Sequence, residues 1–128
     1  MTGYSWKAED IIWMAGWIEA ECYVGLMNTK TRWRKRPTKY AVVECTNTDK
    51  KIIDWLKSTF GGVVAVRTRK KEWGDNPERA KPAWRWRVMC QKAYRLCKAV
   101  MPYMKGDKKR KVKEVVDFYK KKGWEATE

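Results

Sequence analysis

The spacing of apolar residues changes several times along the 128-residue chain, and each change predicts a new element. Residues 8–21 are predicted to form an α-helix, because their apolar side chains recur every three to four residues. The positions of this apolar stripe are Ile11, Met14 and Ile18. Residues 23–28 and 39–46 have the composition of strands, and a strongly basic stretch that ends at Pro37 separates them. The chain therefore begins with a helix and a β-hairpin.

A second helix and hairpin are predicted in the middle of the chain. Residues 49–60 carry apolar side chains at helical spacing, Thr48 is the expected N-cap, and Gly61 with Gly62 ends the helix. Residues 63–69 and 83–90 are the predicted strands. Alternation in the last strand places its tryptophans and its arginines on opposite faces. These arginines are Arg85 and Arg87.

Two further helices, over residues 91–104 and 108–123, complete the pattern. The resulting order is α-ββ-α-ββ-α-α. This order predicts an α+β fold in which one four-stranded antiparallel sheet is backed by helices on one face. A chain of this length is expected to form a single domain, residues 1–128.

The balance of charge predicts a polyanionic partner. Thirty Lys and Arg residues against fifteen Asp and Glu residues give a formal net charge of +15. Nucleic acid is therefore the expected partner. No apolar run approaches the roughly 18 residues of a membrane-spanning helix, and the first residues lack a signal-peptide pattern. We expect a protein that is not secreted, in the cytoplasm or in whichever organellar or phage-host compartment holds its target DNA.

Cysteine and histidine usage narrows the possible chemistry. The four cysteines stand singly, without CxxC spacing, and the chain has no histidine. This excludes most structural zinc sites as well as Ser-His-Asp and Cys-His catalysis. We interpret the cysteines as buried, reduced thiols. Any catalysis must then use carboxylates, lysines, hydroxyls or a hard metal ion.

The segment "MAGWIEAEC", residues 14–22, resembles the signature of the LAGLIDADG homing endonuclease family. Later segments resemble the same family in the same order. These are "NTDKKIIDWLKSTFGG", "WRWRV" and "MPYMKGDKK". The resemblance covers nearly the whole chain, and a single copy of the signature is of the type that works as a homodimer. It implies the αββαββαα fold with a four-stranded DNA-binding sheet.

The resemblance also implies an activity and a metal site. Family members hydrolyse phosphodiester bonds in double-stranded DNA with Mg²⁺, or another divalent cation such as Mn²⁺, held by the last acid of each signature. That acid corresponds to Glu21. A second copy of the chain would supply the second acid, so we expect a C₂ homodimer acting on a long, near-palindromic site. The residues expected at the dimer interface are Ile12, Ala15, Gly16, Glu19 and Ala20.

Simple physical reasons are consistent with this arrangement. Small residues four apart, Gly16 and Ala20, leave a groove into which a second helix can pack closely. Carboxylates at the C-terminal end of a helix are disfavoured by the helix dipole and by each other, and a divalent cation relieves both penalties. The alternative is an ordinary packing helix whose terminal glutamates are solvated. In the family the first acid, Glu19 here, more often caps structure than binds metal.

The resemblance implies further polar residues near the metal. A polar side chain after the second strand and a lysine near the last helix would position or deprotonate water. Asn47 and Lys51 match the first region, and Lys108 is the candidate for the lysine, although Asp107 occupies the expected position. Glu21 in place of aspartate and Cys22 in place of glycine are further departures. They leave open whether the chain cuts, nicks or only binds DNA.

A basic surface for DNA is expected on the sheet and its hairpin loops, because Lys and Arg contact phosphates and polar side chains contact base edges. Trp33 and Trp73 stand among these charges and either stack on bases or anchor loops. The expected DNA-binding residues are Lys30, Arg32, Trp33, Arg34, Lys35, Arg36, Lys39, Arg67, Arg69, Lys70, Lys71, Arg85 and Arg87. A solvated surface charge is the alternative for any single one of them.

Three functions fit the sequence. The first is a homing endonuclease of a mobile intron or intein-like element. The second is a non-cleaving binder of the same fold, either an intron RNA splicing cofactor (maturase) or a DNA-binding regulator. The third is a basic, ribosomal-type RNA-binding protein, which gives no reason for the small-residue groove and its trailing acids.

Overall fold

The computed structural model of the chain describes residues 6–29, 38–67 and 82–121. The elements follow the order predicted from the sequence, with a short 3₁₀ helix before the last helix. Their bounds are α1 Ala8–Glu21, β1 Tyr23–Thr29, β2 Thr38–Asn47, α2 Lys50–Phe60, β3 Val63–Arg67, β4 Ala83–Met89, α3 Cys90–Val100, η2 Met101–Tyr103 and α4 Lys108–Lys121. The predicted α+β fold and its αββαββαα order are confirmed.

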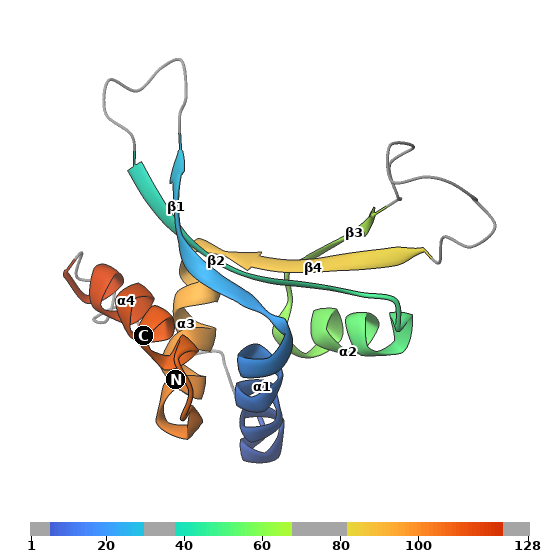
Figure 1. The fold of residues 1–128 in the computed structure, drawn as a ribbon, viewed down its shortest axis with the longest axis horizontal. Helices are drawn as coiled ribbons and strands as arrows, with labels where there is room; N and C mark the ends of the chain where they lie inside the picture. Colours follow the sequence, from blue (N-terminus) through green and yellow to red (C-terminus); the bar gives the residue numbers. More distant parts are fainter. Residues whose placement is uncertain (1–5, 30–37, 68–81, 122–128) are drawn as a thin grey trace.

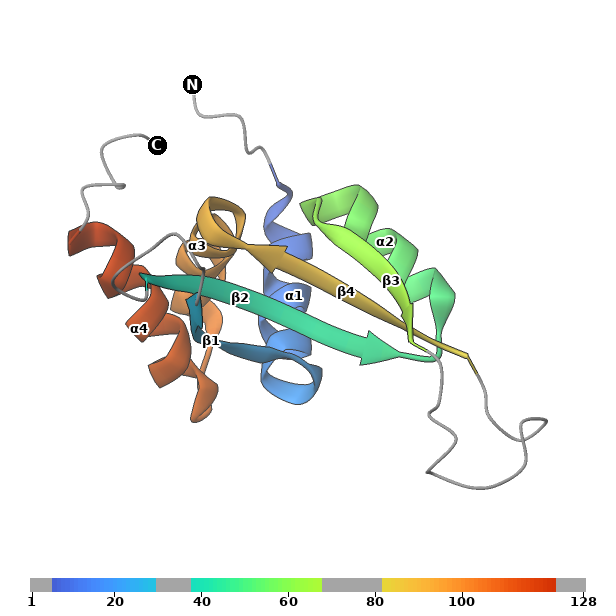
Figure 2. The ribbon, with the colours of Figure 1, turned by 90° about the horizontal axis from the view of Figure 1, so that it is seen from above.

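The four strands form one antiparallel sheet in the order β1-β2-β4-β3. Tyr23 of β1 lies opposite Glu44 of β2, which in turn lies opposite Arg87 of β4. The helices all lie on one side of the sheet, and α1 points away from it with its C-terminal end beside the start of β1 (Figure 1). Viewed from above, the strands cross over α1, and no helix among the described residues covers their other face (Figure 2).

Alternation along the strands divides the sheet into a helix-packed face and an open face. Val43 and Cys45 of β2 and Trp86 and Val88 of β4 are buried against the helices. The helix residues in this core are those of the predicted apolar stripes. They include Ile18 of α1, Leu56 of α2, Leu96 of α3 and Val112, Val115, Val116 and Tyr119 of α4. The core thus uses one face of every strand and leaves the other for solvent or a ligand.

Helix α2 differs from the prediction at its first residue. Asp49, not Thr48, is the N-cap, and its carboxylate accepts a hydrogen bond from the backbone N–H of Lys51 at 3.0 Å. A carboxylate also interacts favourably with the positive end of the helix dipole. The predicted helix end is confirmed, because Gly61 and Gly62 have φ values of 78° and 98°. The helix therefore stops where only glycine adopts the backbone without strain.

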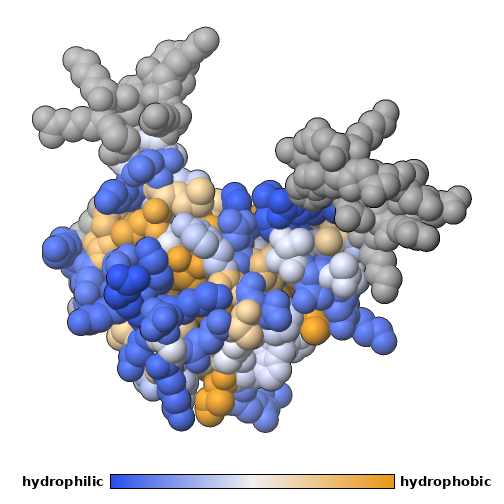
Figure 3. All heavy atoms as spheres, viewed as in Figure 1, coloured by the Kyte–Doolittle hydropathy of each residue, from blue (hydrophilic) through white to orange (hydrophobic). Residues whose placement is uncertain are grey.

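The outer surface of α1 is apolar in places. Ile12 is 52% exposed and Trp13 43% exposed. In the space-filling view, apolar side chains reach the surface over the lower part of α1 (Figure 3). Across the described ranges, no helix combines the length and apolarity that crossing a membrane requires.

Candidate nucleic-acid interface and metal site

The open face of the sheet carries the arginines that the sequence placed there. The register puts Arg85 opposite Thr46 and Ala65, and puts Arg87 opposite Glu44 and Val63. Arg67 shares this face, because it pairs with Ala83 two residues before Arg85. The face is therefore basic across its two strands farthest from β1.

Glu21 lies in a hollow of the same region. It is the last residue of α1, and β1 begins two residues later, so the carboxylate stands where the helix meets the sheet. The hollow has a volume of about 530 Å³. It is lined by Glu21, Tyr23, Glu44, Cys45, Thr46, Ala65, Val66, Arg67 and Arg85. The structure thus brings the predicted metal ligand together with two of the predicted DNA-binding arginines.

Two long-range contacts fix the end of α1 that carries Glu21. The Lys108 ammonium donates to the backbone carbonyls of Ile18, at 3.1 Å, and Cys22, at 2.6 Å. The Glu19 carboxylate accepts from the backbone N–H groups of Lys105, at 2.9 Å, and Gly106. Hydrogen bonds from Gly106 and then Lys105 lower the pKa of Glu19. A cation at the helix C-terminus also offsets the negative end of the helix dipole. The Lys108 ammonium therefore makes this position less unfavourable for a carboxylate.

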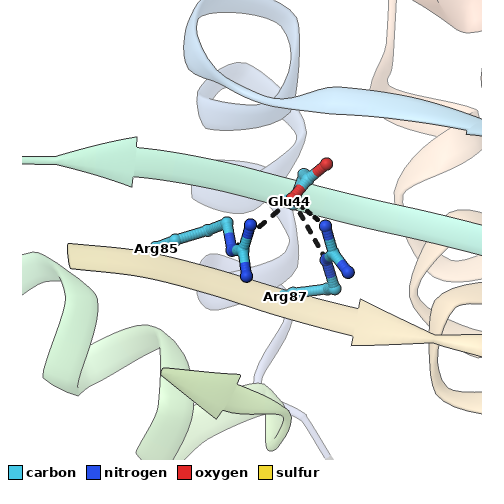
Figure 4. Close-up of polar contacts among 3 residues, drawn as sticks. All are labelled: Glu44, Arg85 and Arg87. Atoms are coloured by element: carbon cyan, nitrogen blue, oxygen red, sulfur yellow. Dashed lines mark hydrogen bonds and ion pairs between the residues drawn. The ribbon is translucent and has the colours of Figure 1, made fainter. Parts of the chain in front are cut away.

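Glu44 was not among the residues selected from the sequence, yet it organises the centre of the open face. Its Oε2 accepts from Nε of Arg87 at 3.1 Å and from Nη2 of Arg87 at 2.9 Å. Nε of Arg85 lies 3.9 Å from the same oxygen (Figure 4). Alternation in β2 puts Glu44 on the face opposite Val43 and Cys45. Its pairing with Arg87 depends on a strand register that local sequence does not reveal.

The other predicted catalytic residues lie outside the hollow that Glu21 lines. Asn47 accepts from the backbone N–H of Asp49 at 2.8 Å, so it orders the turn into α2. Lys51 lines a second hollow, of about 480 Å³, between α1 and α2. Lys108 lies beside the end of α1, with its ammonium directed to carbonyl groups. Of the three, Lys108 is thus the one that contacts the end of α1 carrying Glu21, although its ammonium binds backbone carbonyls.

The predicted DNA-binding residues divide into three groups. Lys30, Arg32, Trp33, Arg34, Lys35, Arg36, Arg69, Lys70 and Lys71 lie outside the described residues. Arg67, Arg85 and Arg87 lie on the open face, as expected. Lys39 is the exception, because alternation with Ala41 and Val43 puts it on the face that the helices cover, although its own side chain is exposed.

The predicted interface residues also divide. Ile12, Gly16 and Ala20 are exposed on α1. A Cβ atom added at Gly16 would meet no atom within 4 Å, so this protomer alone does not require glycine there. Ala15 was expected at the dimer interface, but it is 1% exposed and belongs to the core of its own protomer, so its side chain offers almost no surface to a second copy. Glu19 is engaged with the turn at residues 105–106.

The acidic side chains of one chain fit a divalent cation only if other ligands, such as a phosphate, share it. Among the described residues of one chain, no three His, Cys, Asp or Glu side chains gather to hold a metal ion. Mg²⁺ commonly takes one or two carboxylates and completes its shell with water and substrate phosphates. The exposed carboxylate of Glu21, beside a basic face, suits that kind of site.

Comparisons with solved structures identify the architecture. The fold matches I-CvuI bound to its target, with a TM-score of 0.67 and 14% identity over 89% of this chain and 68% of that one. It also matches I-CeuI complexed with DNA (TM-score 0.60, 13% identity, 87% and 54% of the chains). A third match is the I-SmaMI LAGLIDADG homing endonuclease bound to cleaved DNA (TM-score 0.59, 17% identity, 90% of this chain and 38% of that one). The chain thus has the fold of LAGLIDADG homing endonucleases, and it spans between about two thirds and two fifths of their lengths.

Comparisons of sequence add nothing to this fold assignment. No protein-family model and no curated protein matches the sequence. The likeness is therefore one of structure, at low sequence identity.

Proposed function

We propose that the protein is a sequence-specific, metal-dependent endonuclease that acts as a homodimer on a long, near-palindromic double-stranded DNA site. The observation that carries the proposal is the position of Glu21, whose carboxylate lines one hollow with Arg67 and Arg85. Arginines on an open sheet face suit phosphates and base edges, and an exposed acid beside them suits a cation shared with a phosphate. We place this activity in the compartment that holds the target DNA.

Each residue of the site has a separate role in this proposal. Glu21 would hold Mg²⁺ or Mn²⁺, and such an ion supplies charge neutralisation at a phosphodiester and a more acidic water. Glu19 and Lys108 hold the end of α1 and so fix where Glu21 stands. Arg67 and Arg85, which line the same hollow, would bind the DNA beside this ion.

The exposed face of α1 supports the proposed dimer. One chain brings one Glu21, whereas cutting two strands requires two metal-binding carboxylates. Gly16 lies on an exposed helix face with open space above it. A second copy of α1 can approach closely there, which would bring two Glu21 side chains together.

A non-cleaving DNA or intron RNA binder of the same fold is the second candidate. One observation favours it. The ammonium of Lys108 donates hydrogen bonds to the carbonyls of Ile18 and Cys22, at 3.1 and 2.6 Å, and is not directed to the hollow at Glu21. A lysine in such contacts is less available to move a proton from water.

The test is a selection from randomised palindromic duplexes, with binding measured in Ca²⁺ and cleavage in Mg²⁺. We expect the wild-type protein to enrich one site family and to cut it. Glu21→Gln should retain binding and lose cleavage, whereas Glu114→Gln, which removes the same charge on α4, should retain both. Binding without cleavage by the wild-type protein would favour the second candidate, and no enrichment would contradict both DNA-binding functions.

A further inference from the structure

This inference rests on the proposed binding of duplex DNA and concerns how Arg87 is presented to it. Arg87 uses Nε and Nη2 to bind one oxygen of Glu44, at 3.1 and 2.9 Å. These two nitrogens form the side edge of the planar guanidinium. The end edge, formed by Nη1 and Nη2, is therefore not the edge that Glu44 occupies. That end edge is the fork that matches N7 and O6 of guanine in the major groove.

The pair lies where a bound duplex would be contacted. Glu44 and Arg87 are register partners in the two central strands, on the face without helices. Their side chains are 20% and 23% exposed, so water screens the pair less than it screens a fully exposed ion pair. A charge-assisted contact through two N–H groups restricts the guanidinium to one plane. Arg87 is thus ordered before any ligand arrives.

A carboxylate at this position is unfavourable for simple DNA affinity, because it repels phosphates. Stabilising the pairing of β2 with β4 does not explain the carboxylate of Glu44, because six residue pairs already join these strands. Preorganisation gives a reason. An arginine held in one plane loses less conformational entropy on binding a base, and it is less able to turn toward a nearby phosphate.

We propose that Glu44 is a positioning residue that directs the end edge of Arg87 toward a guanine in each half of the site. It increases discrimination between bases and lowers affinity for unrelated sequences. Arg85, whose Nε lies 3.9 Å from the same Glu44 oxygen, is held less closely. The discrimination therefore depends mainly on Arg87.

The experiment selects randomised duplexes with the wild-type chain and three variants, in Ca²⁺, and measures affinity for a fixed random duplex. Glu44→Gln should lower the preference for guanine at one position of each half-site by about tenfold and raise the affinity for random duplex. Arg87→Lys, which keeps the charge but not the fork, should lose the same preference and retain random-duplex affinity. Glu114→Gln, the charge-matched control on α4, should change neither the guanine preference nor the affinity for random duplex.

The outcomes separate this inference from the proposed function. If the wild-type protein enriches a site and either Glu44→Gln or Arg87→Lys retains its guanine preference, the positioning role is wrong while DNA recognition stands. If the wild-type protein enriches no sequence, the proposed function itself fails. Thermal unfolding of each variant identifies any misfolding. If Glu44→Gln misfolds, Arg87→Lys is the deciding variant, because a retained guanine preference without the guanidinium fork would overturn the positioning role.

Discussion

The ammonium of Lys108 donates a 2.6 Å hydrogen bond to the backbone carbonyl of Cys22, which follows Glu21 directly. A second bond, to the carbonyl of Ile18, joins the same amine to the last turn of α1. One lysine from the start of α4 therefore binds the carbonyl of the C-cap residue, Cys22, and that of Ile18, which also accepts the backbone N–H of Cys22 at 3.2 Å. Its charge also opposes the negative end of the helix dipole.

Removing this amine should destabilise the fold. We expect Lys108→Met to lower the free energy of unfolding by about 2 kcal/mol, since the lost hydrogen bonds involve a charged donor. Lys109→Met, at the exposed neighbouring position, should change it much less. Urea unfolding followed by circular dichroism measures both. Equal stabilities of the two variants would show that the contacts of Lys108 contribute little.

The contact of Glu19 with the turn at residues 105–106 predicts a dependence of stability on pH. Hydrogen bonds from the backbone N–H groups of Gly106 and Lys105 lower the pKa of Glu19 in the folded protein. The unfolded chain has the ordinary value of 4.5, so the stabilising effect is fully present above that pH. It should decline as pH falls through the lower pKa of the folded state.

Thermal unfolding at several pH values between about 3 and 6 tests this linkage. The stability of Glu19→Gln should fall less than that of the wild-type protein over this range, because a neutral side chain has no proton to take up. Gly106→Ala should weaken the same contact, since an added Cβ would lie 2.8 Å from Glu19 Oε1. Identical pH profiles for the wild-type protein and Glu19→Gln would contradict the linkage.

The cysteines should differ sharply in reactivity. Cys90 is exposed, which corrects the interpretation of all four cysteines as buried, whereas Cys22, Cys45 and Cys97 are buried. Burial raises the pKa of Cys97 to about 12, and the hydrogen bond with Cys45 is the main cause of a raised pKa at Cys22. Because the thiolate is the reactive form, iodoacetamide at pH 8 should label Cys90 rapidly, and Cys22 and Cys97 only on unfolding. Peptide mass spectrometry measures each site, and rapid labelling of Cys97 would contradict its burial.

Local sequence predicted the elements because their signals are local. The end of α2 follows from two adjacent glycines, and the opposite faces of Trp86 and Arg87 follow from alternation in one strand. The predicted N-cap of α2 was wrong by one residue, because Thr48 and Asp49 are both good caps and the turn geometry selects between them.

The contacts that organise the site could not be predicted from local sequence. Glu44 meets Arg87 across 43 residues, and Lys108 meets Cys22 across 86. Such pairs depend on strand register and on how helices pack, which no window of local sequence contains. Glu21 was selected as a candidate because it belongs to a family signature, whereas Glu44 had no such signal.

Gly16 gives the clearest test of how two copies of α1 meet. It lies inside a helix, where glycine is up to about 1 kcal/mol less favourable than alanine. A Cβ atom added there would meet no atom of its own protomer within 4 Å. Gly16→Ala should therefore stabilise the isolated protomer. If α1 packs on its copy at this position, the two added methyl groups should weaken dimerisation about tenfold or more.

These opposite effects can be measured on the same samples. Light scattering over a range of protein concentrations reports the dimer, and urea unfolding at low concentration reports the protomer. Gly62→Ala is the matched contrast, because a Cβ atom there would lie 2.5 Å from the Arg87 carbonyl oxygen at a φ of 98°. It should destabilise the protomer by more than about 2 kcal/mol. A Gly16→Ala variant that dimerises as tightly as the wild-type protein would place the contact between copies elsewhere than at this groove of α1.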